Sequence, residues 1–162
     1  EIDGEIEKLG NETNINKNFT FKFETSIPNL ETMSYIMESV ILKHKSIATA
    51  YVGFQKMSRA ESIWDRYHKM ANNVKGIYVF GKKDKELAPH ENIEFVYLPE
   101  EHPLKKEWFL IIDHPEGKSM LVAYDLDGFG KYKDEKKRNF IGFKTSNPLF
   151  VNQGVNLITT VI

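Results

Sequence analysis

The sequence predicts a layered α/β (α+β) fold, a single domain with a mixed sheet of about five to six strands flanked by helices. Two apolar runs indicate buried strands: residues 120–124 contain no turn residue, and in residues 108–113 both alternating sets of side chains are apolar. Two longer segments instead carry apolar residues every three or four positions, as amphipathic helices do. At 162 residues the chain has the length of one domain.

Residues 1–18 are expected to form an N-terminal extension or linker. Ile2, Ile6 and Leu9 have helical spacing, but the polar, turn-prone residues 11–18 follow them. The stretch is either a frayed terminus or the end of a signalling helix from an upstream domain. Because the chain starts without Met and stops on apolar residues, we expect a fragment of a longer protein.

The first strand and helix follow directly. Phe19, Phe21 and Phe23 alternate with polar residues, which predicts a short half-buried strand. Pro28 suits the first turn of a helix that runs to about residue 45. Its buried stripe is expected to contain Leu30, Met33, Met37, Val40 and Ile41.

The middle of the chain predicts a strand, a second helix and four further strands. Ser58 and Glu61 have the spacing of a capping box, so a helix is expected over residues 58–74. The strands are expected at residues 47–54, 77–81, 93–98, 108–113 and 120–124. Because residues 108–113 are apolar on both faces, this strand should lie in the middle of the sheet.

After residue 124 the sequence predicts a charged loop that leaves the core, followed by a further strand over residues 138–145. Ser146 or Asn147 can cap a helix over residues 147–160, with Pro148 in its first turn. The loop is basic, with Lys131, Lys133, Lys136, Lys137 and Arg138. It is either a solvated connector or an anion site or docking face. Arg138 directly precedes the apolar strand, so packing could hold it.

Composition excludes several classes of function. The 22 Lys and Arg against 23 Asp and Glu give a net charge of −1, too little positive field for nucleic-acid binding. No apolar run approaches the roughly 20 residues that span a bilayer, and the N-terminus is too polar for a signal peptide. The absence of Cys excludes thiol nucleophiles and thiolate metal sites. We therefore expect a soluble, cytoplasmic segment without a membrane or nucleic-acid partner.

No catalytic, metal or cofactor motif emerges. The five histidines, at 44, 68, 90, 102 and 114, lack metal-ligand spacing. Asp125, Asp127 and Gly128 match part of a calcium loop, but Ala123 would then occupy the first ligand position, so a solvated turn is expected. No glycine pattern predicts a phosphate cradle. His102-Pro103 and His114-Pro115 are expected to be turns at strand ends.

Five side chains are candidates for a ligand pocket. Aromatic rings with one polar atom combine apolar bulk with hydrogen bonding, and Arg138 could bind an anion. The candidates are Trp64, Tyr67, His68, Trp108 and Arg138. The alternative for the tryptophans is plain core packing.

The order of these elements and the residue motifs within them resemble the DICT family of sensory modules. The resemblance covers about residues 26–160. It rests on the apolar helix before residues 46–48, on Trp64-x-x-Tyr67 leading to residues 79–81, on residues 108–113 followed by 121–123, and on Arg138-x-Phe140-x-Gly142-Phe143-x-Thr145 reaching Val151.

The resemblance implies that residues 19–162 are one DICT-like sensory domain of a bacterial or archaeal signalling protein. Its partner would be an attached or separate output domain, such as a GGDEF cyclase, an EAL or HD-GYP phosphodiesterase or a histidine kinase. It implies no catalysis, no cofactor and no specific ligand-binding residue. A bilin attached through Cys is impossible, because the chain contains no Cys.

The primary hypothesis is therefore a non-catalytic input module that acts by ligand binding or interaction. One alternative is a small-molecule enzyme with Asp113, His114 or Asp125 as acid–base groups, although Asp113 and His114 are adjacent and should point to opposite faces. A second is a structural dimerisation domain, with the Ile2, Ile6 and Leu9 stripe or the apolar C-terminal residues as its interface. Those residues are Val155, Leu157, Ile158, Val161 and Ile162.

Overall fold

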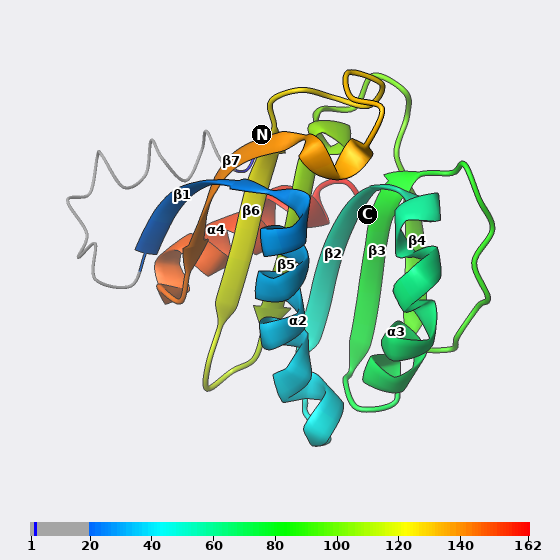
Figure 1. Cartoon of the computed structure of the whole chain (residues 1–162). Coiled ribbons are helices and arrows are strands. Elements are labelled where there is room, and N and C mark those ends of the chain that lie inside the picture. The colour runs from blue at the N-terminus through cyan, green and yellow to red at the C-terminus, as the bar shows by residue number, and fades with distance from the viewer. Residues whose placement is uncertain (1, 3–19) are drawn as a thin grey trace.

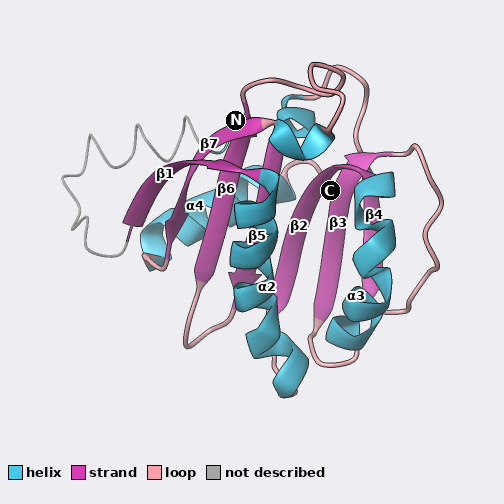
Figure 2. Cartoon of the chain, viewed as in Figure 1, coloured by secondary structure: helices cyan, strands magenta, loops and turns pink. Residues whose placement is uncertain are grey.

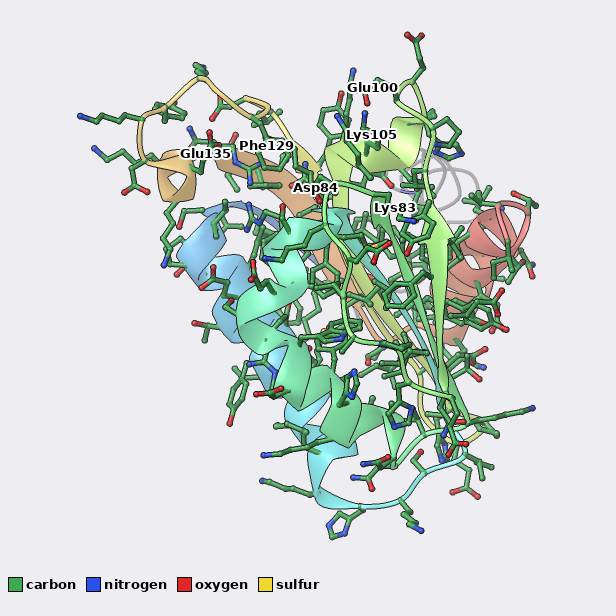
Figure 3. All side chains as sticks on the ribbon, turned by 90° about the vertical axis from the view of Figure 1, so that its right-hand side faces the viewer. Lys83, Asp84, Glu100, Lys105, Phe129 and Glu135 are labelled. Carbon is green, nitrogen blue, oxygen red and sulfur yellow. The ribbon has the colours of Figure 1, made fainter. Side chains whose placement is uncertain are left out.

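The computed structural model of the chain describes residue 2 and residues 20–162. A seven-stranded mixed sheet forms the centre, and helices cover both faces (Figures 1 and 2). Helices α2 and α3 lie on one face and α4 lies on the other, which Figure 3 shows from the side. The predicted layered α/β fold is confirmed, with seven strands instead of five to six.

The strands are ordered β1-β7-β6-β5-β2-β3-β4 across the sheet. Strands β2, β3 and β4 are parallel to one another, and every other neighbouring pair is antiparallel. Their bounds are β1 Thr20–Ser26, β2 Thr49–Lys56, β3 Gly76–Lys82, β4 Ile93–Tyr97, β5 Glu107–Asp113, β6 Ser119–Asp125 and β7 Asn139–Thr145. The carboxyl ends of β2, β3 and β4 therefore lie at the same end of the sheet as the carboxyl end of β6.

Three α-helices and three short 3₁₀ helices complete the described part of the chain. They are α2 Ile27–Lys43, η2 Met57–Ile63, α3 Trp64–Ala71, η3 Pro103–Lys106, η4 Glu135–Lys137 and α4 Pro148–Thr159. Asn147 caps α4 as expected, because its Oδ1 accepts a hydrogen bond from the backbone N–H of Leu149 at 3.0 Å. Among the described residues, no helix combines the length and hydropathy that a bilayer crossing requires.

Strand β5 is the fourth of the seven strands, so its predicted central position is confirmed. Its residues from Glu107 to Ile112 are buried, and residues 120–123 of β6 are buried beside them. Burial on both faces explains why neither strand shows a polar alternation in its sequence.

The sheet separates two cores. Trp108, Leu110 and Phe140 pack with α2 and α3 on one face. Phe109, Ile111 and Val122 pack with α4 on the other, together with Ile2 from the N-terminal end. In α4, Ile158 is fully buried in this second core, with Val155 and Val161 packed against it. These residues of the predicted dimer interface thus contact their own chain, while Ile6 and Leu9 lie outside the described residues.

Three local predictions were wrong. Val40, which was expected in the buried stripe of α2, is 71% exposed. The expected helix over residues 58–74 is divided into η2 and the shorter α3, and Ser58 caps no helix. The backbone N–H and hydroxyl of Ser58 bind the carboxylate of Asp84 instead. Phe21 is 69% exposed because β1 is an edge strand, while Phe23 is half-buried and Phe19 lies outside the described residues.

A candidate ligand-binding cavity

A cavity of about 600 Å³ lies between α2 and the η2–α3 segment. Val52 and Phe54 of β2 and Trp108 of β5 line it from the sheet. Its ionisable lining residues are Glu31, Glu38, Arg59, Arg66 and Lys136, and its further aromatic residues are Tyr35 and Tyr67. Phe54 lies near the carboxyl end of a parallel strand, which is where open α/β sheets commonly bind ligands.

Glu38 is a buried carboxylate in the cavity lining. Its Oε1 accepts a hydrogen bond from Arg66 Nη2 at 2.9 Å, and its side chain is only 1% exposed. Burial raises the pKa of Glu38, and the Tyr67 hydroxyl and the Arg66 guanidinium partly oppose this increase. Glu38 Oε2 has no hydrogen-bond partner within residues 20–162.

Tyr67 is coupled to the same carboxylate. Burial, and next the negative charge of Glu38, raise the pKa of Tyr67 well above its ordinary value. The phenol is therefore a neutral hydrogen-bond donor over the physiological pH range. It stabilises the ionised form of Glu38, which burial alone would disfavour.

Trp108 and Arg59 form the opposite part of the lining. Trp108 Nε1 donates to Ser34 Oγ at 3.2 Å, and the Arg59 guanidinium carbon lies 5.3 Å from the centroid of the Trp108 ring. Burial lowers the pKa of Arg59, and the nearby charge of Arg138 lowers it further, although the carboxylates of Glu31, Glu135 and Asp125 act in the opposite direction. Arg59 makes no hydrogen bond or ion pair with any described residue.

Two of the five predicted pocket residues, Tyr67 and Trp108, line this cavity. Trp64 and His68 do not line it. Trp64 Nε1 donates to the backbone oxygen of Ala88 at 2.8 Å, and His68 Nε2 lies 2.9 Å from the same oxygen. Both side chains hold the connection between β3 and β4 against α3.

Arg138 is fully buried outside the cavity. Its Nη1 donates to Asp125 Oδ2 at 2.6 Å and to Gln55 Oε1 at 3.2 Å. Gln55 Nε2 also donates to Asp125 Oδ2, at 3.0 Å. Gln55 has a positive φ of 69°, in a β-bulge at the end of β2. Arg138 therefore links the carboxyl ends of β2 and β6 to the start of β7, all at the same end of the sheet.

The 126–138 loop connects this buried ion pair to the cavity. The ring of Phe129 in the loop contacts two cations: Lys56 Nζ is 3.8 Å and the Arg138 guanidinium carbon 4.0 Å from its centroid. Figure 3 shows Phe129 and Glu135 on this loop, above α2 and α3. Lys136, two residues before the buried Arg138, lines the cavity. The loop is thus both anchored to the sheet and part of the cavity wall.

The other motifs of the sequence have local structural partners. Asp125 Oδ1 accepts hydrogen bonds from the backbone N–H groups of Asp127 and Gly128, so the Asp-Leu-Asp-Gly segment is a turn. Asp113 pairs with Lys118, and the backbone N–H of Glu116 donates to His114 Nδ1. Within residues 20–162, no group of three or more His, Asp or Glu side chains has the arrangement of a metal site.

The three acid–base candidates do not converge. Glu107 of β5 pairs with Tyr124 of β6 in the antiparallel ladder. Asp113 and His114 therefore lie at the end of the sheet opposite to Asp125. The three side chains therefore cannot act together as the acid–base pair that the enzyme hypothesis required.

Sequence reasoning missed four charged residues of the lining, Glu31, Glu38, Arg59 and Arg66. Glu38 alone had a detectable signal, because it falls with Ser34 on the buried side of α2, where Leu30, Met37 and Ile41 are apolar. A carboxylate on the buried face of a helix requires a partner. Arg59 and Arg66 look like ordinary surface cations in the sequence, since their positions depend on how η2 and α3 pack.

The comparisons with known proteins identify the fold and the family. No curated protein matches the chain. The crystal structure of polyphosphate kinase from Porphyromonas gingivalis is similar, with a TM-score of 0.60 and 7% sequence identity. The similarity covers 88% of this chain and 23% of that one, so this chain spans less than a quarter of its length. At this identity the likeness shows the fold alone.

The DICT model, described as a sensory domain in diguanylate cyclases and two-component systems, matches residues 13–126. The matched range contains β1 to β6, α2, α3 and every cavity-lining residue except Lys136. The match extends over more than half of the sequence. The chain therefore belongs to the DICT family of sensory domains.

Proposed function

We propose that this domain is a non-catalytic input module that binds a small molecule in the cavity and thereby regulates an attached or partner output domain. The observation that carries this proposal is the cavity itself. Its volume of about 600 Å³ falls in the range of small-molecule sites, and its lining combines aromatic rings with a few ionisable groups. Tyr67 and Trp108 are the two ring residues that we expect to contact the ligand.

The proposed mechanism is a shift between two conformations. The cavity walls come from α2, from the η2–α3 segment and from η4, which lie far apart in the sequence. A ligand that contacts all three favours one relative arrangement of these segments. Only a difference in affinity between two arrangements can change the activity of the output domain.

The proposed output is a cyclic-di-GMP or two-component activity. The family description supports this choice, because it names diguanylate cyclases and two-component systems as proteins with such a sensory domain. A GGDEF cyclase, an EAL or HD-GYP phosphodiesterase and a histidine kinase are the candidate output domains. We propose a cytoplasmic location, which the absence of Cys supports.

The test fills the cavity in the full-length protein that carries this domain. Thr32 lines the cavity from the exposed side of α2, and its hydroxyl binds the backbone oxygen of Pro28 at 3.1 Å. Thr32→Trp should occupy part of the cavity volume without disturbing the sheet. Ser39→Trp is the matched control, because Ser39 lies on the same helix, outside the lining, and makes a similar bond to Ile36.

Cyclase, phosphodiesterase or kinase activity is measured with and without a small-molecule extract of the host cells. We expect the extract to change the activity of the wild type and of Ser39→Trp, and to have a much weaker effect on Thr32→Trp. Deletion of residues 20–162 should abolish the response. A response that survives this deletion unchanged would refute the sensory role, and an equal response in both Trp variants would refute the cavity as its site.

A further inference from the structure

The geometry points to an organic anion as the ligand: a small molecule whose carboxylate or phosphate binds Arg59 while its apolar or aromatic body fills the cavity. This inference rests on the proposed function of the cavity as a ligand site. It adds the charge of the ligand and the residue that recognises it.

Arg59 is the unusual arginine of the chain. Arg66 pairs with Glu38 and Arg138 pairs with Asp125, both within 2.9 Å. Arg59 has no such partner among the described residues, although it is half-buried and faces the cavity. Its guanidinium carbon lies over the ring of Trp108, 5.3 Å from the centroid, and this cation–π contact orients the side chain. A guanidinium that is held in place but has no acceptor is ready to bind an oxyanion through two parallel hydrogen bonds.

The charge of the lining agrees with an anionic ligand. Three cationic side chains face two carboxylates, and the Glu38–Arg66 pair neutralises one of each. Of the remaining groups, Arg59 and Lys136 outweigh Glu31. The side chain of Lys136 also makes no ion pair with a described residue. Arg138 also lies near Arg59, but Asp125 and Glu135 already pair with it, so the lining residues decide the charge of the site.

The rest of the lining indicates an organic body. Tyr35, Phe54, Tyr67 and Trp108 supply aromatic surface, and Val52 and Ile63 supply aliphatic surface. A bare inorganic anion would leave most of this apolar surface in contact with water. Burial of an apolar or aromatic group there removes apolar surface from water on both sides and so favours binding. The two parts of the site thus recognise two parts of one molecule.

The test uses small monosubstituted benzenes whose polar groups differ in charge: the anions phenyl phosphate and benzoate, neutral benzamide and cationic benzylamine. Each is titrated into ¹⁵N-labelled protein while the Arg59 Nε–H and Trp108 indole N–H resonances are recorded. We expect saturable shifts of both resonances with at least one of the two anions. The neutral and cationic probes should bind at least tenfold more weakly.

Arg59→Gln should weaken binding of the preferred anion at least tenfold, as read from the Trp108 resonance. Arg59→Lys keeps the charge but loses the two-bond geometry, and should give an intermediate affinity. Lys83→Gln is the matched control, because Lys83 pairs with the exposed Glu86 and is absent from the cavity lining. The remaining amide resonances of each variant report whether the fold is intact.

Comparison of phenyl phosphate with benzoate shows whether the site prefers a phosphate or a carboxylate. Absence of a saturable shift with both anions would overturn the inference, as would equal binding in Arg59→Gln and Lys83→Gln. If benzamide binds at the cavity as tightly as benzoate, the inference about charge fails but the cavity still serves as the proposed ligand site. The effect of Thr32→Trp on output activity tests the proposed function separately.

Discussion

Glu38 and Asp125 are both buried carboxylates with an arginine partner, but their surroundings differ. Asp125 Oδ2 accepts hydrogen bonds from Arg138 and Gln55, and its Oδ1 accepts two backbone N–H groups. Glu38 has Arg66 and Tyr67, and its Oε2 is unpartnered among residues 20–162. Both oxygens of Asp125 are therefore satisfied, although Arg138 Nη2 has no hydrogen-bond partner among the described residues. The Glu38 carboxylate, by contrast, leaves one acceptor unused beside a cavity.

Glu38→Gln should change how stability depends on pH. Because the pKa of Glu38 is raised above 4.5, the folded state holds this proton more tightly than the unfolded state does. The wild type should therefore lose stability relative to Glu38→Gln as the pH rises from 4.5 through the raised pKa, by at most about 1.4 kcal/mol per pH unit. Urea unfolding of both proteins between pH 4.5 and 7.5 measures the difference.

Tyr67→Phe provides a second variant in the same series. The Tyr67 hydroxyl lowers the pKa of Glu38, so its removal should raise that pKa further and extend the pH-dependent range upwards. The prediction for Glu38 would be contradicted if the free energy of unfolding of the wild type, relative to that of Glu38→Gln, stayed constant or increased as the pH rises.

Arg138→Gln should destabilise the fold strongly. It removes the partner of the buried Asp125 carboxylate, whose side chain is 2% exposed. An uncompensated buried charge costs about 3–5 kcal/mol, which guanidinium unfolding at pH 7 can measure. Lys131→Gln removes a cation from the same loop, where Lys131 is 57% exposed and pairs with Asp127. Near-equal midpoints for the two variants would contradict a structural role for Arg138.

At the scale of elements, the sequence predicts where the chain is regular better than where each helix begins. The central strands are evident because apolar residues occupy both alternating sets in β5. The division of residues 57–71 into η2 and α3 is not evident, because the Ser58–Glu61 spacing fits a helix start equally well. The decisive contact of Ser58 is with Asp84, 26 residues later. Local sequence cannot contain this information.

Gly142→Ala should destabilise the sheet through the contact between β6 and β7. A Cβ at position 142 would overlap the carbonyl oxygen of Val122 and lie 2.7 Å from the Cα of Ala123. Both are backbone atoms, so the strands themselves must move, at a cost of about 1–3 kcal/mol. Gly117→Ala is the control, because nothing lies within 4 Å of its added Cβ. Thermal unfolding should show a lower midpoint for Gly142→Ala only.

At the scale of the whole molecule, the layers were predictable and the cavity was not. The two helices on one face and the C-terminal helix on the other follow from the apolar stripes that each must bury. The cavity depends on how α2 packs against the η2–α3 segment and on where the 126–138 loop returns. Of the predicted pocket residues, Tyr67 and Trp108 reach it, while Trp64 and His68 contact the backbone oxygen of Ala88 instead.

The chain cut after residue 126, where the family match ends, should not fold on its own. Strand β7 lies between β1 and β6, so its removal leaves β1 without a partner in the sheet and makes β6 an edge strand. Loss of α4 also uncovers the second core, where Phe150, Val151 and Ile158 are buried. Each such side chain contributes roughly 1.5–3 kcal/mol. Three of them approach the roughly 5–15 kcal/mol that stabilises a typical domain.

Near-ultraviolet circular dichroism and amide proton dispersion measure this outcome. Residues 1–126 should show neither fixed aromatic packing nor a cooperative unfolding transition, whereas residues 1–162 should show both. Removal of residues 160–162 is the control, because Thr160 and Ile162 are exposed and only Val161 is partly buried against the core. A cooperative transition in residues 1–126 would mean that β7 and α4 are additions to a fold that is complete without them.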